Sequence, residues 1–308
     1  MLLKTNVDIP IDSIKINFDT EGLWILNIAL AIIMFGVALS IKIDDFKLLI
    51  KKPKILFVGI FSQFFLLPAL TFVAILIIKP QPSFALGMMM IAACPGGNIS
   101  NFFSKMANGN AALSVSLTAF ATLICIIMTP FNLQFYGGLY EPTNAILKTV
   151  ELDPFSLFKL VLLILGVPLI LGMLTNIYFE ETAKKIEKKL KPFSMIIFLA
   201  LIVIAVYDNL DIFLNYIHLV AGLVIFHNIG AYVIGFYTAK TFGLEKRDRK
   251  TISMETGIQN GGLGLLLIFQ FFDGLGGMAL FAAFWSIWDI FSGLVLATFW
   301  TKDNKQLK

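Results

Sequence analysis

One carboxylate, two carboxamides and four glycines lie between Ser253 and Gly264, in a segment that is otherwise apolar enough to span a membrane. An ionised carboxylate near the bilayer centre costs about 2.5–3.5 kcal/mol on insertion scales, so Glu255 requires a compensating partner. The glycines indicate a backbone that departs from a regular helix. A second polar interruption lies earlier, at Cys94-Pro95-Gly96-Gly97-Asn98. Two interrupted apolar segments are typical of the binding site of a secondary transporter.

Each interruption has a predictable electrostatic character. A helix that is broken inside the membrane leaves unpaired N–H groups at one half and unpaired carbonyls at the other. The amino end suits an anion and the carbonyl end a cation. We expect new half-helices to begin at Asn98 and Ile99 and at Asn260 and Gly261. If the segments cross, two helix amino ends meet at one point, which is the predicted substrate site.

The polar side chains near these interruptions are hard oxygen ligands. They form no cluster of histidines or thiolates, which disfavours zinc and copper. A single glutamate cannot supply the several carboxylates of a usual divalent-ion site, whereas hydroxyls, amides and one carboxylate suit Na⁺. Ser114 and Thr118 share a helix face, and each could instead bond to its own helix. The candidate oxygen ligands are Gln63, Ser100, Asn101, Ser114, Thr118, Glu255 and Gln259.

Composition indicates an integral membrane protein with the lipid bilayer as a partner. Of 308 residues, 58% are hydrophobic and 14% charged, whereas soluble domains have about 25% charged residues. The net charge of +4 comes from clusters beside apolar spans, so we predict no nucleic-acid partner. Cys94 and Cys125 are predicted to be buried thiols. No nucleophile–base pair or metal-hydrolase motif is found, so we predict that the protein is not an enzyme.

The predicted fold is an all-α membrane protein with nine transmembrane helices. The third and eighth spans are interrupted and run in opposite directions, as in an inverted-topology repeat whose first half lacks its leading helix. The predicted spans are 23–41, 54–78, 83–107, 111–131, 155–178, 192–212, 216–240, 250–272 and 277–300.

Most of the 24 basic residues fall in one alternating set of connections, which predicts that these connections are cytoplasmic. Residues 1–22 then form a polar extracellular arm without a signal peptide, and 303–308 form a cytoplasmic tail. The predicted location is the plasma (inner) membrane, with the amino terminus outside and several passes through the bilayer.

Three segments resemble the bile acid:sodium symporter family: Cys-Pro-Gly-Gly-Asn-Ile-Ser-Asn (94–101), Gly-Asn-Ala-Ala-Leu-Ser-Val-Ser-Leu-Thr (109–118) and Glu-Thr-Gly-Ile-Gln-Asn-Gly-Gly-Leu (255–263). The resemblance extends from about residue 24 to 300. It implies an inverted-repeat core with two crossing broken helices, which a separate panel domain moves against. The panel would comprise 23–45 and 155–212, and the core 46–154 and 213–302. The implied function is Na⁺-coupled symport of an organic anion, bile acid-like or a small organic acid, by alternating access.

The resemblance also implies two Na⁺ sites and a substrate site. The first Na⁺ site would comprise Ser100, Asn101, Ser114, Thr118 and Glu255, and the second Gln63, Glu255, Thr256, Ile258 and Gln259. Glu255 would then be shared by two cations. The positions that match the family's substrate contacts are Asn98, Ile99, Asn260 and Gly261, to which we add Asp289, a second intramembrane acid.

Several alternatives stay open at this point. Asp289 fits either the wall of a water-filled cavity or a structural hydrogen-bonding role, and His227 is predicted to be a packing residue rather than a ligand. A proton-coupled organic anion transporter of the same fold would use Glu255 or Asp289 to carry H⁺. Cys94 beside the first interruption would suit a metalloid or drug exporter. A small-molecule receptor that binds without transport is a further alternative. The sequence leaves the substrate's identity and the oligomeric state open.

Overall fold

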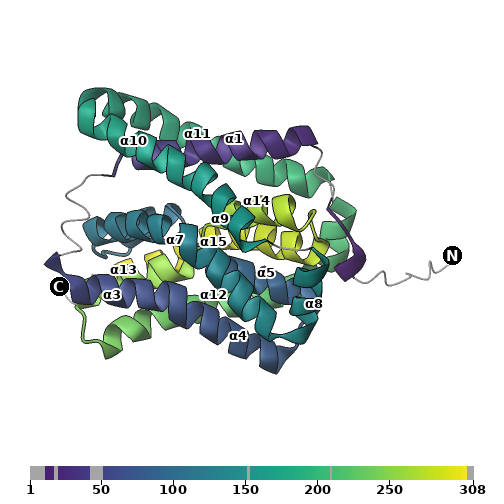
Figure 1. Cartoon of the computed structure of the whole chain (residues 1–308). Coiled ribbons are helices and arrows are strands. Elements are labelled where there is room, and N and C mark those ends of the chain that lie inside the picture. Colours follow the sequence, from purple (N-terminus) through teal and green to yellow (C-terminus); the bar gives the residue numbers. More distant parts are fainter. Residues whose placement is uncertain (1–10, 17–19, 42–50, 151–152, 209, 304–308) are drawn as a thin grey trace, which may run out of the picture.

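The computed structural model describes residues 11–16, 20–41, 51–150, 153–208 and 210–303. Within these ranges the chain forms helices, joined by short connections and two isolated β-bridges, and no β-strand (Figure 1). The elements are η1 (Ile11–Ser13), α1 (Thr20–Ala38), α3 (Pro53–Phe61), η2 (Ser62–Leu66), α4 (Leu67–Ile78), α5 (Pro82–Ala93), α6 (Ile99–Met106), α7 (Ala111–Leu139), α8 (Glu141–Thr149), α9 (Pro154–Val161), η3 (Leu162–Gly166), α10 (Val167–Tyr178), α11 (Glu180–Asp208), α12 (Leu210–Thr241), α13 (Lys246–Gly257), α14 (Gly261–Phe271) and α15 (Gly276–Asp303).

Five helices of the described chain are long and apolar enough to cross a membrane. They cover Pro53–Ile78, Ala111–Leu139, Phe155–Tyr178, Leu210–Thr241 and Gly276–Thr301, and shorter apolar helices cover Asn27–Ala38, Pro82–Ala93 and Gly261–Phe271. The third and eighth predicted spans are each split into two helices, α5 with α6 and α13 with α14. The all-helical membrane architecture is therefore as predicted, while the count of nine spans and the inverted repeat stay predictions.

Several helices extend beyond the spans predicted for them. The sixth span was predicted at 192–212, but α11 already begins at Glu180, and the basic stretch that we assigned to a connection is helical. Lys and Glu are good helix formers, and Lys184 pairs with Glu180 and Glu181 along the helix. α7 continues eight residues beyond its predicted end at 131, and the short helix α8 was not predicted at all.

The helices are arranged in two layers. α1, α10 and α11 pack against one another and lie together at the top of Figure 1. Below them α5 packs on α7 and α15, α13 packs on α12, and α6 lies against α7, α13 and α15. α9 and η3 contact α7, and α1 contacts α14, so the layers meet along these elements.

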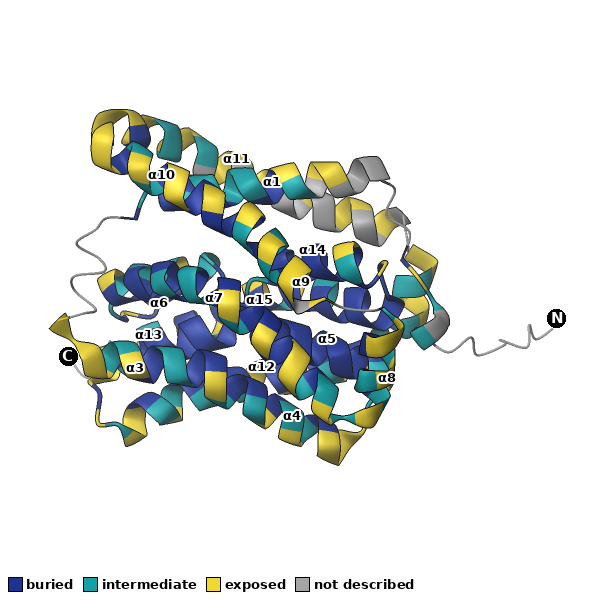
Figure 2. Ribbon diagram, viewed as in Figure 1, coloured by how far each residue is buried: buried dark blue, intermediate teal, exposed yellow. Residues whose placement is uncertain are grey.

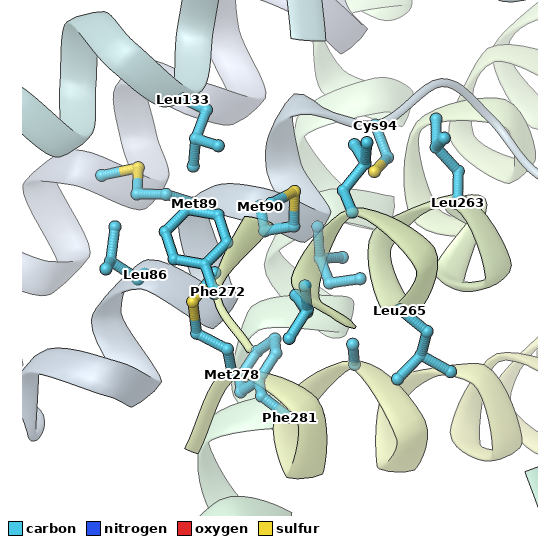
Figure 3. Packing of buried hydrophobic residues seen from close by; sticks show 14 of the residues in the cluster. Leu86, Met89, Met90, Cys94, Leu133, Leu263, Leu265, Phe272, Met278 and Phe281 are labelled. Carbon is cyan, nitrogen blue, oxygen red and sulfur yellow. The ribbon is translucent and has the colours of Figure 1, made fainter. Parts of the chain in front are cut away.

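The two interruptions are enclosed by protein, since residues 94–97 and 257–259 are buried, whereas α6 and the continuous helices are partly exposed. Most residues of α5, α13 and α14 are buried, while α3, α4 and α10 present apolar residues on their outer faces (Figure 2). Leucine, methionine and phenylalanine side chains of α5, α14 and α15, including Met90, Leu263 and Phe281, interlock between them (Figure 3). Irregular backbone at membrane depth is tolerated only when protein covers it, so this burial is what permits the interruptions.

Residues 11–16 of the predicted polar arm are packed against the helices. Asp12 Oδ1 accepts a hydrogen bond from Ser83 N at the first turn of α5 (2.8 Å). Ile16 N donates to Gly274 O (2.8 Å), and Gly276 N donates to Ile14 O (2.7 Å), which joins the arm to the turn between α14 and α15. Ile11 is fully buried. Residues 1–10 of the predicted arm lie outside the described residues.

Candidate functional site

The two helix interruptions cross and pair with each other through their main chains. Gly96 and Gln259 form an antiparallel bridge. Gly97 N donates to Ile258 O (2.8 Å), and Asn260 N donates to Pro95 O (2.8 Å). Backbone groups that leave their own helix at one interruption are thus satisfied by the other.

Both half-helices begin where the sequence predicts. α6 starts at Ile99 with Asn98 as its N-cap, and α14 starts at Gly261 with Asn260 as its N-cap. The Asn260 side chain accepts from Leu263 N (3.0 Å), whereas Oδ1 of Asn98 is buried without a hydrogen-bond partner among the described residues. Two helix amino ends, each with partial positive charge, therefore lie at the crossing.

Three side chains of the first predicted Na⁺ set contact the Glu255 carboxylate, and the fifth member, Asn101, lies next to one of them. Glu255 is 2% exposed and accepts from Ser100 Oγ (2.5 Å) and Ser114 Oγ (2.5 Å) through Oε1. Its Oε2 lies 2.8 Å from Thr118 Oγ1, which is also 3.3 Å from Asn101 Oδ1. In the described chain Glu255 has no ion pair with a basic residue.

Thr118 Oγ1 also lies 3.0 Å from Ser114 O, one turn earlier in the same helix. The structure therefore contains the bond to its own helix that the sequence left open, in addition to the contact with Glu255. The contact to Glu255 is the shorter of the two.

The second predicted set lies around Gly96. A methyl group placed on Gly96 would lie 2.9 Å from Glu255 O, 3.0 Å from Glu255 Oε2 and 3.1 Å from Gln63 Nε2. Gln259 Nε2 donates to Thr256 O (2.7 Å), and Ile258 O accepts from Gly97 N. The set thus lines the crossing from two helices and from the stretch between α13 and α14, and only a residue without a side chain fits at position 96. Gln63 comes from η2, Glu255 and Thr256 from α13, and Ile258 and Gln259 from the stretch after it.

The donor set and its unsatisfied atoms fit a small monovalent cation. Nε2 of Gln63 and Oε1 of Gln259 are buried and lack hydrogen-bond partners among the described residues. The oxygen and nitrogen of a glutamine amide are exchangeable assignments, so Gln63 can present its oxygen at the same place. Among the described residues, no three histidine, cysteine, aspartate or glutamate side chains are placed so that they could hold a metal ion together. This donor set lacks the several carboxylates of a divalent-ion site.

The Asp289 carboxylate lies beside the second interruption and accepts hydrogen bonds from three N–H groups. Its Oδ2 accepts from Gln259 N (3.1 Å) and Trp285 Nε1 (2.9 Å), and its Oδ1 accepts from Asn228 Nδ2 (3.1 Å). Asp289 is 3% exposed. These bonds agree with the structural hydrogen-bonding role that was one of the two alternatives for Asp289. Its assignment to the substrate site stays a prediction.

His227, predicted as a packing residue, packs against Phe281 and Trp285, and its Nε2 lies 2.7 Å from Thr71 Oγ1.

Sequence reasoning missed several residues that support the crossing. Ser62 Oγ lies 3.0 Å from Thr256 Oγ1, and Asn228 Nδ2 donates to Gly257 O (2.8 Å). On α7, Thr129 Oγ1 donates to Ala93 O, at the end of α5 (2.6 Å), and Asn132 Nδ2 donates to Phe64 O (2.9 Å). Each is a polar residue in an apolar span, which is the signal that could have found them.

A cluster at the other ends of α6 and α13 was also missed. The buried Lys250 Nζ donates to Ala107 O (3.0 Å) and Trp300 O (3.2 Å), and Asn110 Nδ2 donates to Asp248 Oδ1 (2.9 Å). These contacts hold the turn between α6 and α7 against α13. Because Ser100 lies on α6, Ser114 on α7 and Glu255 on α13, the contacts help to keep the two serines near the carboxylate.

Comparison with known proteins gives a consistent result. The sequence model of the Sodium Bile acid symporter family matches residues 27–216. The uncharacterized sodium-dependent transporter YocS of Bacillus subtilis is 32% identical over 293 residues, 94% of this chain and 88% of the relative. The probable sodium/metabolite cotransporter BASS1, chloroplastic, of Arabidopsis thaliana is 29% identical over 283 residues, 91% of this chain and 68% of the relative.

The ileal sodium/bile acid cotransporter of Homo sapiens is 29% identical over 238 residues, 77% of this chain and 66% of the relative. These relatives are named as transporters and not as enzymes. The family match covers more than half of the chain, and the Bacillus relative matches over most of its length. The chain therefore belongs to the Sodium Bile acid symporter family, a family of sodium-dependent membrane transporters.

Proposed function

We propose that the protein couples the downhill entry of Na⁺ to the uptake of an organic anion by alternating access. The observation that carries this proposal is the environment of Glu255. Its carboxylate is buried at the crossing of two interrupted helices, accepts hydrogen bonds from three hydroxyl groups, and has no ion pair with a basic residue in the described chain.

Two Na⁺ ions bind at this carboxylate. Ser100, Asn101, Ser114, Thr118 and Glu255 hold the first ion, and Gln63, Glu255, Thr256, Ile258 and Gln259 hold the second. The convergence of four of these side chains on one another and the unsatisfied amide atoms of Gln63 and Gln259 support the two sets. Because Glu255 belongs to both sets, the two ions would share one carboxylate.

The organic anion binds at the amino ends of α6 and α14, at Asn98, Ile99, Asn260 and Gly261, with Asp289 behind them. The partial positive charge of the two helix ends supports an anionic substrate. A bile acid-like or small organic acid is the proposed class, since bile acid and metabolite appear in the names of the human and plant relatives.

The movement is a rocking of a panel against a core. The panel comprises 23–45 and 155–212, and the core 46–154 and 213–302. The mutual packing of α1, α10 and α11 in one layer supports this division. Na⁺ binding fixes the crossing, and an anion that prefers the fixed crossing raises the Na⁺ affinity in return, because linkage is reciprocal.

The proposed topology has nine spans in the plasma (inner) membrane, with an inverted repeat around the two crossing helices. The amino terminus lies outside and the carboxyl terminus in the cytoplasm. The distribution of lysine and arginine along the chain supports this orientation.

Ligand screening of the purified protein tests the proposed function. Thermal unfolding is measured with a panel of organic anions, once in Na⁺ and once in K⁺ buffer. We expect at least one anion to raise the midpoint temperature in Na⁺ only, because a ligand that binds the folded state stabilises it by mass action. That anion is then used in proteoliposome counterflow. Counterflow that runs on a pH gradient without Na⁺ would instead identify the proton-coupled transporter, and Na⁺-dependent binding without counterflow would identify a receptor.

A further inference from the structure

The second predicted span contains a π-helical turn beside the second Na⁺ set. The helix Pro53–Ile78 is continuous except for η2, Ser62–Leu66, in which Leu67 N donates to Ser62 O instead of Gln63 O. Pro68 follows directly. Proline has no N–H, and its ring crowds the carbonyl four residues earlier, which here is Phe64 O. The sequence Leu67-Pro68 therefore explains locally why the regular helix gives way.

The carbonyl that loses its helical donor finds a replacement on another helix. Asn132 Nδ2, from α7, donates to Phe64 O at 2.9 Å. Asn132 is 3% exposed, so the amide has little access to an alternative partner in solvent. A buried carbonyl without a hydrogen-bond partner is unfavourable. Asn132 therefore favours the π-turn over helix geometries in which Phe64 O would lie out of its reach.

The π-turn determines where Gln63 points. One extra residue in a helix rotates the preceding part by about 100° relative to the following part. In this register Ser62 Oγ lies 3.0 Å from Thr256 Oγ1, and Gln63 Nε2 and Glu255 Oε2 both border Gly96. A regular helix through 62–66 would turn Ser62 and Gln63 away from α13, or turn Phe64 and Phe65 into new positions.

We propose that Asn132 is a positioning residue of the second Na⁺ set: by bonding to Phe64 O it holds the π-turn that presents Gln63 to Glu255. The assignment rests on the proposed function and deepens it. Asn132 belongs to neither ligand set, and it acts through the π-turn, mainly on Gln63. α7 then contributes to both sets, directly through Ser114 and Thr118 and indirectly through Asn132.

The chain holds a matched control for this arrangement in the other layer. η3 is also a π-turn, with Val167 N donating to Leu162 O, and Pro168 follows it. Asn176 Nδ2 donates to Ile41 O at the same distance of 2.9 Å and is also buried. Pro168 and Asn176 both lie in α10, which packs against α1, α11 and η3.

The test measures binding of radioactive sodium to the purified full-length protein, for wild type, Asn132→Leu and Asn176→Leu. A net hydrogen bond to a neutral group is worth about 1 kcal/mol, so we expect the Kd of one of the two Na⁺ sites to rise about fivefold in Asn132→Leu. The other site should keep its Kd. Asn176→Leu, which loses the same type of bond, should bind both ions as wild type does.

A double-mutant cycle separates positioning from a general loss of stability. In the background of Gln63→Ala, Asn132→Leu should cause a much smaller further loss of Na⁺ affinity than it causes in wild type, because most of its effect passes through Gln63. If Asn132→Leu does not fold, Pro68→Ala takes its place. It restores an N–H for Phe64 O, favours the regular helix and should weaken the same site, while Pro168→Ala should not.

Equal Na⁺ titrations for wild type and Asn132→Leu would overturn the assignment and leave the proposed function intact. So would additive losses in the double-mutant cycle. Absence of saturable Na⁺ binding in the wild type would overturn the proposed function itself, and with it this assignment.

Discussion

The carboxylate of Glu255 is stabilised by its hydrogen bonds to an extent that can be estimated. Burying an ionised carboxylate costs several kcal/mol even after relaxation. Hydrogen bonds to a charged group contribute about 1.5–3 kcal/mol each, and Ser100, Ser114 and Thr118 supply three donors. The donors offset a large part of the cost of burial without neutralising the charge. A bound cation supplies that neutralisation, which is why the proposed function begins with Na⁺.

Gly96→Ala tests the close packing at the crossing. The added methyl group would lie within 3.1 Å of Glu255 O, Glu255 Oε2 and Gln63 Nε2, and two of these three atoms belong to groups that cannot move without disturbing a Na⁺ set. We expect a loss of about 1–3 kcal/mol in the free energy of unfolding. The increase in midpoint temperature that Na⁺ causes should also be lost.

Gly138→Ala is the matched control for this substitution. Gly138 lies in α7, and a methyl group there would meet no atom within 4 Å. Alanine favours a helix more than glycine does, so the midpoint temperature of this variant should rise slightly in both buffers, and the increase that Na⁺ causes should equal that of wild type. A Gly96→Ala protein that keeps the full stabilisation by Na⁺ would show that position 96 is not part of the cation site.

At the scale of the elements, a hydrogen-bond network supports the second interruption, and the donor and acceptor of each of its bonds are determined. Asn228 donates to Gly257 O and accepts from Trp288 Nε1, so its amide orientation is determined. Its Nδ2 therefore faces Asp289, which accepts from Asn228, Gln259 and Trp285. Both oxygens of the Asp289 carboxylate are required as acceptors.

Asp289→Asn should therefore destabilise the protein although it preserves size. The new NH₂ group would face either Asn228 Nδ2 or the N–H groups of Gln259 and Trp285, and leaving a buried donor unpaired costs about 1–3 kcal/mol. Thermal unfolding in Na⁺-free buffer should show the loss. Asp211→Asn, at an exposed position near the start of α12, should unfold as wild type does. Equal midpoints for the two variants would contradict this account of the network.

The sequence predicted these elements where the signal is local. Proline and glycine at 95–97 and asparagine followed by glycine at 260–261 interrupt a helix by their own backbone chemistry, and both half-helices begin as expected. The start of α11 was missed because lysine and glutamate favour both helices and polar connections. The partnership of Asn132 with Phe64 O was not predictable, since it joins residues 68 positions apart through tertiary packing.

For the whole molecule, the proposed orientation places Gln81 outside and Lys188 in the cytoplasm. Both side chains are exposed, Gln81 before α5 and Lys188 on α11. In intact cells a membrane-impermeant maleimide should label Gln81→Cys and spare Lys188→Cys, while permeabilised cells should label both. The native Cys94 and Cys125 are buried, so background labelling should be low. Labelling of Lys188→Cys alone in intact cells would show that the orientation is reversed.

The account of the whole transporter depends on the binding of Na⁺ at Glu255. Equilibrium binding of radioactive sodium to the purified protein tests it most directly, with Glu255→Gln compared with Glu141→Gln, an exposed glutamate of α8. Because Glu255 belongs to both sets, we predict saturable binding of two ions to wild type and to Glu141→Gln, and none to Glu255→Gln. Saturable binding of Na⁺ to Glu255→Gln with the stoichiometry and affinity of wild type would contradict the account.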